Sequence, residues 1–307
     1  MSFSGEVKEE LAKHINSARH CQIAEFTAIV YCCGQIHRKE NGEIVFALNT
    51  ENEAVWRKCF TLLRKTFNID SAVGEDSKQL MIELTDHDII WNIFQTIKLL
   101  DQDGVFHGFD EPVNNMLIKN ACCRRAFLRG TFLCCGSMSD PAKGYHLEMA
   151  VDSMEKAIQL QDVLKDFDLD AKIVLRKKYY VVYLKEGANI VDFLNICEAH
   201  VSLMNFENFR IVKEVRNSVN RRVNCETANI TKIVNASTKQ IADIEFLRDK
   251  YGFDNLPDNL REMAQVRITY PDASLKELGQ YLNPPVGKSG VNHRLRKLSE
   301  IAEEIRI

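Results

Sequence analysis

The residues with the clearest chemical capacity lie close together near the C-terminus of the chain. Cationic, amide and hydroxyl side chains recur between positions 274 and 297, and such groups suit hydrogen bonds to phosphates and to the edges of bases. We therefore expect DNA contacts from nine residues of this segment: Ser274, Lys276, Lys288, Ser289, Asn292, His293, Arg294, Arg296 and Lys297. We expect Asn292, His293, Arg294 and Arg296 to lie nearest the bases. Lys288 and Lys297 are expected to bind phosphates.

Two helices joined by a tight turn would position these side chains. Ser274 can cap a short helix that runs through Leu282, and the turn Asn283–Gly287 follows because two consecutive prolines cannot continue a helix. The longer helix after the turn carries an apolar stripe at helical spacing: Val291, Leu295, Leu298, Ala302 and Ile305. This order is typical of the helix-turn-helix, whose second helix enters the major groove. The alternative is a helical hairpin with a solvated basic face.

The tripeptide Gly287-Lys288-Ser289 is similar to the end of the phosphate-binding loop of NTPases. That motif requires a glycine five residues before Gly287, and Leu282 occupies this position without a preceding strand. We therefore exclude an NTPase.

A second basic stretch lies upstream, in a segment that we expect to link two domains (205–226). Arginines alternate there with asparagines, and the side chains that could contact DNA are Arg216, Asn217, Asn220, Arg221, Arg222 and Asn224. The same residues could equally lie in a solvated linker or hydrogen-bond to the neighbouring domain, and the sequence leaves both interpretations open. Helices are expected next, near Ala228–Asn235, Lys239–Lys250 with Ser237 as its cap, and Asp258–Thr269. Together with the helix-turn-helix (274–307) they form an expected all-α domain, 227–307.

The N-terminal two-thirds of the chain contains one helical segment twice. The first copy ends at Gly34 and the second at Gly136, an offset of 102 residues. Small residues recur four apart in each copy: Ala24, Ala28 and Cys32, then Ala126, Gly130 and Cys134. This spacing places them on one stripe of a helix, which lets two helix backbones pack closely. We predict a matched helix pair, with Gly34 and Gly136 in the left-handed conformation that ends a helix.

The elements that follow each helix also correspond. Strands are predicted at Glu43–Asn49, Asp70–Val73 and Gln79–Leu84 in the first repeat, and at Tyr145–Val151, Ala171–Leu175 and Tyr179–Leu184 in the second. Helices are predicted at Glu53–Phe67 and Ile89–Leu100, and at Met154–Phe167 and Ile190–His200. Turns near Asn41-Gly42 and Lys143-Gly144 precede the strands. We expect a duplicated domain, 21–204, with repeats at 21–105 and 121–204, after an N-terminal helix within residues 1–20.

Composition places the chain among ordinary globular proteins, and charge separates its two parts. The 307 residues are 45% hydrophobic, and no apolar run approaches the roughly 20 residues of a membrane span. Residues 1–204 carry a net charge of −6 and residues 205–307 a net charge of +3. A positive field that attracts nucleic acid is therefore expected only in the C-terminal third. The charged N-terminus lacks a secretory segment, which predicts a cytoplasmic protein without a membrane partner.

The chain has ten cysteines, six of which form adjacent pairs: Cys32-Cys33, Cys122-Cys123 and Cys134-Cys135. They lack the Cys-x-x-Cys spacing and the paired downstream histidines of a zinc site. We expect reduced cysteines that act as small core residues, with neither a metal nor another cofactor. A metal or redox role is the alternative.

The two glycine-terminated helices resemble degenerate copies of the motif that names the LAGLIDADG homing endonucleases. The eighth letter of that motif, the acid that holds the catalytic metal in those enzymes, falls on Cys33 and Cys135. Magnesium needs hard oxygen ligands, and sulfur is a soft donor. The acids nearby, such as Glu25 and Asp140, are several residues from either helix end. We therefore predict that the scaffold persists without nuclease activity and without catalytic residues.

A resemblance to the WhiA family extends over essentially the whole chain. Three separated segments carry it: Phe3–Leu11, Arg221–Asn229 and Leu275–Leu298. WhiA proteins are bacterial transcription regulators tied to sporulation or cell division. The resemblance implies a monomeric α+β protein, in which a two-repeat LAGLIDADG-like domain of the order α-β-β-α-β-β-α precedes an all-α helix-turn-helix domain. It also implies a non-enzymatic, nucleoid-associated regulator of cell division and chromosome segregation, or of sporulation in spore formers.

Two other functions remain open beside this one. A metal-dependent DNA endonuclease could use relocated acids, and an adaptor could recruit another transcription regulator through the acidic double domain. The basic cluster at the C-terminal end of the chain favours double-stranded DNA as the partner.

Overall fold

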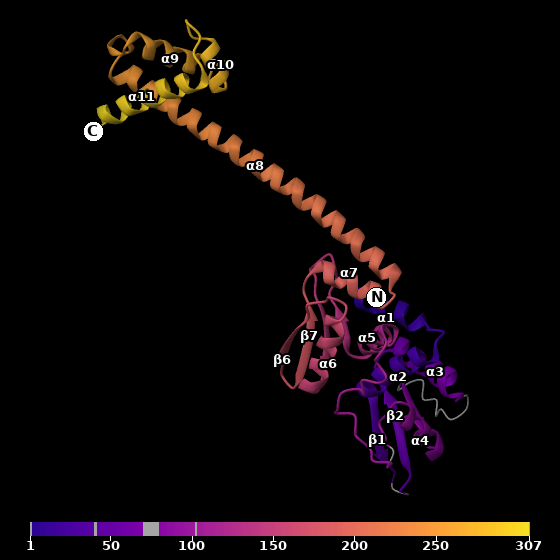
Figure 1. Ribbon diagram of the computed structural model, residues 1–307. Coiled ribbons are helices and arrows are strands. Elements are labelled where there is room, and N and C mark those ends of the chain that lie inside the picture. The colour runs from indigo at the N-terminus through magenta and orange to yellow at the C-terminus, as the bar shows by residue number, and fades with distance from the viewer. Residues whose placement is uncertain (1, 40–41, 70–79, 102, 307) are drawn as a thin grey trace. The chain divides into compact units, whose positions relative to one another are not determined.

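A computed structural model describes residues 2–39, 42–69, 80–101 and 103–306 of the chain (Figure 1). The chain divides into two compact units, Met1–Glu214 and Val215–Ile307. The first unit combines helices with two antiparallel sheets, and the second is helical. The predicted α+β class is confirmed.

The N-terminal unit begins with α1 (Phe3–Lys13) and its first repeat: α2 (Arg19–Cys33), β1 (Gly34–Arg38), β2 (Ile44–Asn49), α3 (Glu53–Phe67), β3 (Met81–Leu84) and α4 (His87–Thr96). Polar side chains begin three of these helices, because Ser2, Asn52 and Asp86 accept hydrogen bonds from amides of the first turns of α1, α3 and α4. The strands form an antiparallel sheet in the order β1-β2-β3. Helix α3 has the bounds that the sequence predicts.

The second repeat has one more strand than the described part of the first: α5 (Ala121–Cys135), β4 (Gly136–Met138), β5 (Leu147–Val151), α6 (Met154–Lys165), β6 (Lys172–Arg176), β7 (Tyr179–Leu184) and α7 (Gly187–Ile196). Its strands pair antiparallel in the order β4-β5-β7-β6. The strands β1 and β4 were not located by the sequence, because each is short and begins directly at the glycine that ends a helix. The predicted strand Asp70–Val73 and Asn41 of the predicted turn lie outside the described residues.

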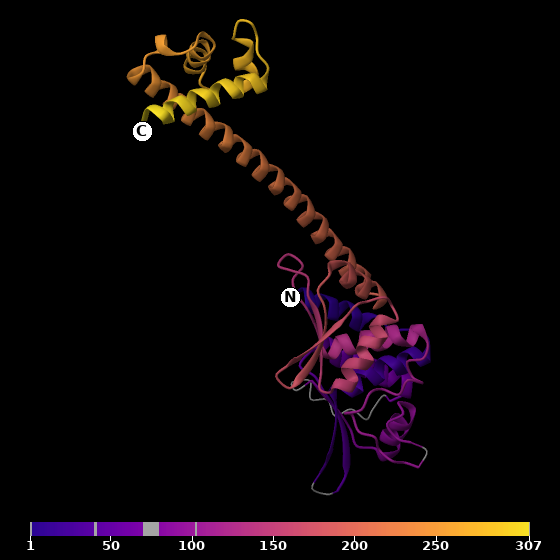
Figure 2. The ribbon, with the colours of Figure 1, turned by 60° about the vertical axis from the view of Figure 1, so that its left-hand side comes forward.

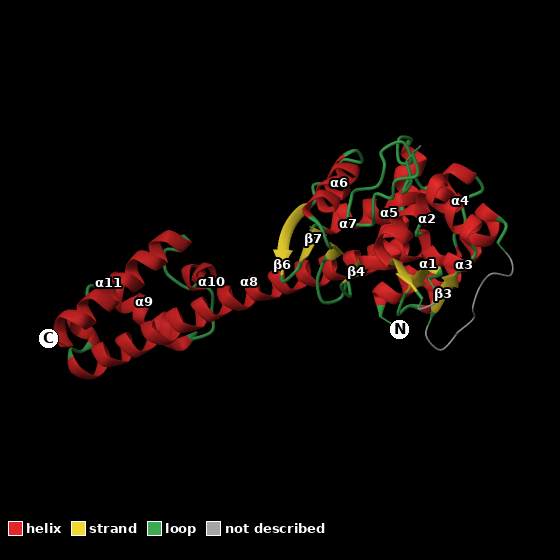
Figure 3. Cartoon of the chain, turned by 90° about the horizontal axis from the view of Figure 1, so that it is seen from below, coloured by secondary structure: helices red, strands yellow, loops and turns green. Residues whose placement is uncertain are grey.

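Helices α2 and α5 pack against each other along their length within the N-terminal unit (Figures 1 and 3). A Cβ atom on Gly130 would lie 2.5 Å from the carbonyl oxygen of Glu25 and 2.9 Å from the Cβ atom of Ala28. The two backbones are therefore nearly in contact at this point. Ala24 and Ala126 are fully buried in one apolar cluster. The predicted pairing of the two helices through small residues is confirmed.

The predicted conformation of Gly34 and Gly136 is wrong. Both residues are extended, with φ of −75° and −84°, because each one starts a strand immediately after its helix. Glycine is nevertheless required at both positions, because a side chain would collide with the preceding helical turn. A Cβ atom on Gly34 would overlap the carbonyl oxygen of Val30, and one on Gly136 would lie 2.5 Å from that of Phe132.

The helices of the N-terminal unit cover one face of its sheets (Figure 2). In β5, the side chains of Leu147, Met149 and Val151 are buried, whereas those between them are half-buried. Buried side chains from both repeats belong to a single core cluster. The two repeats therefore fold as one unit around the α2–α5 pair.

A single helix, α8 (His200–Lys250), replaces the predicted linker 205–226 and the two predicted helices after it. No glycine or proline occurs between positions 205 and 250, so nothing in this stretch forces a helix to end. Ser237 is not a cap, since it lies within α8 and its hydroxyl donates to the carbonyl oxygen of Pro271 at 2.9 Å. No helix in the described part of the chain, α8 included, is long and apolar enough to cross a membrane.

The C-terminal unit contains α8 from Val215 onward, the short 3-10 helix η1 (Phe253–Asn255), α9 (Asp258–Thr269), α10 (Leu275–Gln280) and α11 (Lys288–Arg306). The stripe predicted on α11 faces the core of this unit, since four of its five residues are buried and Ile305 is partly buried. The backbone of the turn lies directly on α10, where Val286 donates to the carbonyl oxygen of Gly279 at 2.9 Å. A Cβ atom on Gly279 would overlap the carbonyl oxygen of Val286.

Candidate nucleic-acid interface

A capping box begins α10, as the sequence predicts for Ser274. The Ser274 hydroxyl accepts a hydrogen bond from the amide of Glu277 at 3.3 Å, and the Glu277 carboxylate accepts one from the amide of Ser274 at 2.8 Å. The hydrogen bond from the backbone amide of Ser274, followed by one from the Ser274 side chain, lowers the pKa of the Glu277 carboxyl. The helix start is thereby fixed, and Ser274 and Lys276 both remain exposed.

The first turns of α11 present a polar and basic surface. Six of the predicted side chains are exposed there: Lys288, Ser289, Asn292, His293, Arg296 and Lys297. The buried stripe of α11 points the other way, into the core of the C-terminal unit. Glu300 lies 3.0 Å from the Nε of Arg296 and 3.7 Å from the Nζ of Lys297. Exposed pairs of this kind contribute at most about 1 kcal/mol, so both cations are available to a phosphate or a base.

Arg294 differs from the other residues predicted in this segment. Its side chain is only 20% exposed, and its guanidinium donates to the carbonyl oxygen of Asn259 at 3.5 Å. A carboxylate oxygen of Glu262 lies 4.0 Å away, and Glu262 also accepts from the amide of Asn283 at 2.7 Å. Arg294 therefore joins α11 to α9, beside the carboxylate that holds the start of the turn.

Two tyrosines at the ends of α9 and α10 were missed by the sequence analysis. The rings of Tyr270 and Tyr281 stack with centroids 4.3 Å apart, although both residues are about half exposed. Tyrosine hydroxyls can donate to phosphates. The position of Tyr281 at the start of the turn was the only signal available, and it does not reveal the stacking partner.

The basic residues of the predicted linker lie on α8 and are all exposed. A helix turns by about 100° per residue, so five of these six side chains lie within an arc of about 140°: Arg216, Asn217, Asn220, Arg221 and Asn224. Arg222 lies outside this arc. Within the described residues, no hydrogen bond or ion pair holds any of these six side chains. Their contact with DNA therefore stays a prediction.

The glycine-terminated ends of α2 and α5 bring cysteines together. The Sγ atoms of Cys32 and Cys135 lie 4.0 Å apart, and Cys33 and Cys134 are half-buried beside them. Burial lowers the pKa of Lys8, which faces these thiols. Lys156 donates to the carbonyl oxygen of Tyr31 at 3.5 Å and to Asp152 at 2.7 Å. Thiols, together with Lys156 and its partner Asp152, thus surround the place where the LAGLIDADG motif has its acids.

The sequence matches three family profiles along its length. The profile of the WhiA N-terminal LAGLIDADG-like domain matches residues 19–80, that of the WhiA LAGLIDADG-like domain matches 124–216, and that of the WhiA C-terminal HTH domain matches 219–302. A probable cell division protein WhiA from Lachnoclostridium phytofermentans is 52% identical over 316 residues and covers all of both chains. This chain belongs to the WhiA family.

Other WhiA proteins agree with this assignment. The probable cell division protein WhiA of Alkaliphilus oremlandii is 46% identical, over 99% of this chain and 98% of its own. The crystal structure of full-length DUF199/WhiA from Thermatoga maritima has a TM-score of 0.58 and 26% identity, over 99% of each chain. The resemblance carried by the three sequence segments is confirmed, and with it the two-part architecture of a LAGLIDADG-like domain and a helix-turn-helix domain.

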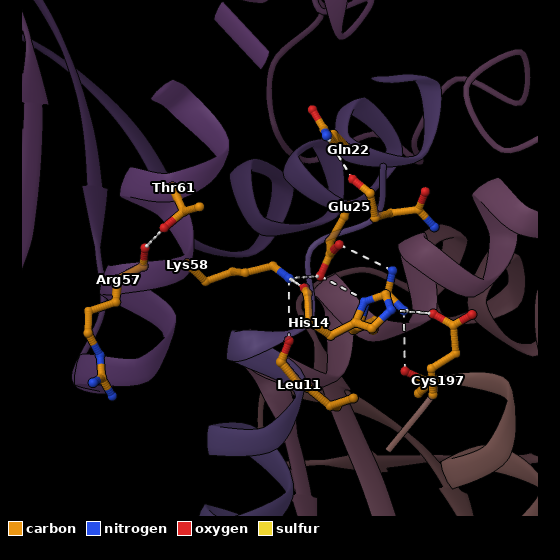
Figure 4. A network of polar contacts seen from close by, with 11 residues as sticks. Leu11, His14, Gln22, Glu25, Arg57, Lys58, Thr61 and Cys197 are labelled. Atoms are coloured by element: carbon orange, nitrogen blue, oxygen red, sulfur yellow. Dashed lines mark hydrogen bonds and ion pairs between the residues drawn. The ribbon is translucent and has the colours of Figure 1, made fainter. Parts of the chain in front are cut away.

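In this WhiA-family chain, the two acids that the sequence analysis names near these helices, Glu25 and Asp140, have structural partners. Glu25 is fully buried, and its carboxylate lies 2.8 Å from the Nζ of Lys58 and 3.0 Å from the Nε of Arg129 (Figure 4). Arg129 also contacts Glu198 at 2.8 Å. Asp140 accepts a hydrogen bond from the amide of Ala142 at 2.9 Å, within the turn after β4. Glu25 is therefore committed to an ion pair within the fold, and Asp140 to its own turn.

Proposed function

We propose that this protein is a non-enzymatic, sequence-specific DNA-binding regulator of transcription that acts as a monomer at the nucleoid in the cytoplasm. The observation that carries the proposal is the exposed polar and basic face of α11, which follows a capped α10 and a tight turn. The relatives named probable cell division protein support a role in cell division. Chromosome segregation, and sporulation in spore formers, are further parts of this proposal.

The first turns of α11 would lie in the major groove of double-stranded DNA. Asn292 and Arg296 are four residues apart on the exposed face, so both side chains can reach base edges together. Arginine suits guanine and asparagine suits adenine, and each bidentate contact provides about 1–3 kcal/mol of discrimination. Lys288 and Lys297 would bind phosphates, which adds affinity that decreases with salt. Arg294 would position α11, because its guanidinium already holds α9.

Flanking contacts would come from α10 and from α8. Ser274 and Lys276 at the start of α10 would bind the DNA backbone next to the groove, as the first helix of a helix-turn-helix does. The arginine and asparagine face of α8 would supply further phosphate contacts. Such contacts fix the position of the protein on the duplex without reading the sequence.

The absence of catalysis rests on the ligands that are present. At the motif position of the metal-binding acids the chain has Cys33 and Cys135, whose sulfur atoms are poor ligands for magnesium. Glu25 is held by two buried cations and Asp140 by its own turn. An arrangement of oxygen ligands for metal-assisted hydrolysis is therefore not favoured.

Operator binding by the full chain tests the proposal. After the operator has been selected from random duplexes, Arg296→Ala and Lys297→Ala should each be measured over a range of salt concentrations. Arg296→Ala should weaken binding to the operator by between about 5-fold and 150-fold and relax specificity at one position. Lys297→Ala should weaken binding to all sequences and reduce the salt slope by about one.

Lys239→Ala is the matched control for both variants. Lys239 pairs with Glu303, at the opposite end of α11, at 3.0 Å. The same charge is therefore removed from the same unit, but away from the proposed reading surface. Operator affinity that is unchanged in Arg296→Ala and Lys297→Ala, or that falls equally in Lys239→Ala, would refute the assignment of α11.

A further inference from the structure

Four side chains that can bind a metal ion meet at the N-terminal ends of α2 and α5. They are His20, Cys21, Cys122 and Cys123, and one possible ligand atom of each lies within 4.8 Å of all the others. Within the described part of the chain, no other group of three or more histidine, cysteine or acidic residues converges in this way. The cluster is at the opposite end of the helix pair from Cys33 and Cys135.

The repeat itself assembles this cluster. The offset of 102 residues that relates Gly34 to Gly136 also relates His20 to Cys122 and Cys21 to Cys123. Each repeat thus contributes two adjacent residues from the first turn of its helix. The close approach of the helices brings the pairs together, which explains why spacing within either segment alone gave no sign of a metal site.

The distances suit tetrahedral coordination. The Nδ1 atom of His20 lies 3.2 Å from the Sγ of Cys123 and 3.3 Å from the Sγ of Cys21. With zinc–sulfur bonds of about 2.3 Å and zinc–nitrogen bonds of about 2.0 Å, ligand atoms in a tetrahedral site lie about 3.5–3.8 Å apart. Small side-chain movements would therefore place all four donors around one ion. The donor set, three thiols and an imidazole, is one of the standard sets for structural zinc.

The surroundings favour the negative charge that such a site carries. Neither Ala18 nor Asn120, the residues before the two helices, caps a first turn with its side chain. Amides of both first turns are therefore free of a side-chain cap and can stabilise thiolates, together with the positive ends of both helix dipoles. Cys21 and Cys123 are buried while His20 and Cys122 are exposed, so an ion can enter from solvent.

We propose that His20, Cys21, Cys122 and Cys123 bind one zinc ion that clamps the first turns of the two repeats together. Coordination exchanges three thiol protons, released to the solvent, for one Zn²⁺, and no oxidation or reduction takes place. The ion has no catalytic role, because all four positions around it are filled by protein ligands. It would stabilise the N-terminal unit, since the two pairs of ligands come from segments 102 residues apart.

Metal content and metal-binding spectra of the full chain test this proposal. Protein purified without chelators should contain one zinc per chain, and cobalt(II) added to the metal-free protein should give the intense ligand-field bands of a tetrahedral thiolate site. His20→Ala and Cys122→Ser alter the two exposed ligands, so both variants should fold. Each should bind zinc at least about 100-fold more weakly, because even changes beyond the direct ligands cost about 10–100-fold.

Two cysteine variants serve as controls. Cys225→Ser removes an exposed thiol from α8, and Cys32→Ser removes one at the other end of α2. Both variants should have the same zinc content and cobalt spectrum as the unaltered chain. A chelator should lower their thermal stability as much as it lowers that of the unaltered chain. The proposal is overturned if the unaltered chain binds neither zinc nor cobalt, if Cys32→Ser loses the ion while Cys122→Ser retains it, or if these cysteines form a disulfide instead.

Discussion

Replacing Glu25 by glutamine should destabilise the N-terminal unit by about 3–5 kcal/mol. The Glu25 side chain is 0% exposed and lies 2.8 Å from the Nζ of Lys58 and 3.0 Å from the Nε of Arg129. Glutamine keeps the shape but removes the charge, so two buried cations would face a neutral amide. Arg129 would retain Glu198 at 2.8 Å, whereas Lys58 would keep only the carbonyl oxygens of Leu11 and His14 (Figure 4).

Urea unfolding followed by tryptophan fluorescence isolates this effect. Both tryptophans, Trp56 and Trp91, belong to the N-terminal unit, so unfolding of the C-terminal unit does not contribute directly to the signal. Glu9→Gln is the matched control, because Glu9 pairs with Arg57 at 2.8 Å on the surface. That variant should cost less than about 1 kcal/mol.

The pH dependence gives a second check. Burial lowers the pKa of Lys58 even when Glu25 is present, and loss of the carboxylate should lower it further. The folded variant then binds fewer protons than the unfolded chain, so its stability rises with pH between the folded pKa and the unfolded value of about 10.4. The difference in the free energy of unfolding between the unaltered chain and Glu25→Gln should therefore decrease as the pH is raised. If Glu25→Gln and Glu9→Gln unfold at the same urea concentration at pH 7, the reasoning about enclosed charge is wrong.

Three further predictions address the helix pair, the turn and the chemistry. Gly130→Ala should destabilise the N-terminal unit by about 1–3 kcal/mol in the same urea assay, because its Cβ would lie 2.5 Å from a backbone oxygen of α2. Gly144→Ala is the control and should leave the stability unchanged, because its Cβ would meet nothing within 4 Å. Gly279→Ala should lower the temperature of the thermal transition of the C-terminal unit seen by far-ultraviolet circular dichroism, since its Cβ would overlap the carbonyl oxygen of Val286. Gly287→Ala adds the same atom in open space and should leave the transition temperature unchanged. Supercoiled DNA incubated with the pure protein and magnesium should stay as intact as in a metal-free control, and cleavage above that control would revive the endonuclease.

Elements with a strong local pattern were located from the sequence. The stripe from Val291 to Ala302 has a period that only a helix with one buried face satisfies, and the bounds of α3 follow from its cap at Asn52 and its apolar spacing. The small residues of the two glycine-terminated segments likewise predict a close helix pair. Such patterns are reliable because a helix side chain and its neighbours three or four residues away share one environment.

Local pattern was insufficient where the same residue types suit two different conformations. Asparagine and serine are common at helix caps, which led to a predicted break near Ser237, but the α8 backbone continues because no proline or glycine stops it. Gly34 and Gly136 similarly suit either a left-handed cap or a crowded extended position. The pairing of Gly34 with Leu48 and of Gly136 with Met149 in the sheets decides between the two, and this pairing is visible only in three dimensions.

The sequence by itself determined the duplicated helix and the helix-turn-helix, since residue types and short spacings define both. The resemblance to the LAGLIDADG motif added that Cys33 and Cys135 stand at the position of its acids. Only the tertiary structure decided which distant side chains meet. It enclosed Glu25 between two cations, turned Arg294 towards α9 and gathered two cysteine-containing pairs at the first turns of α2 and α5. The physical reason is that a helix fixes the direction of its side chains locally, whereas the partner in each contact is supplied by the packing of another segment.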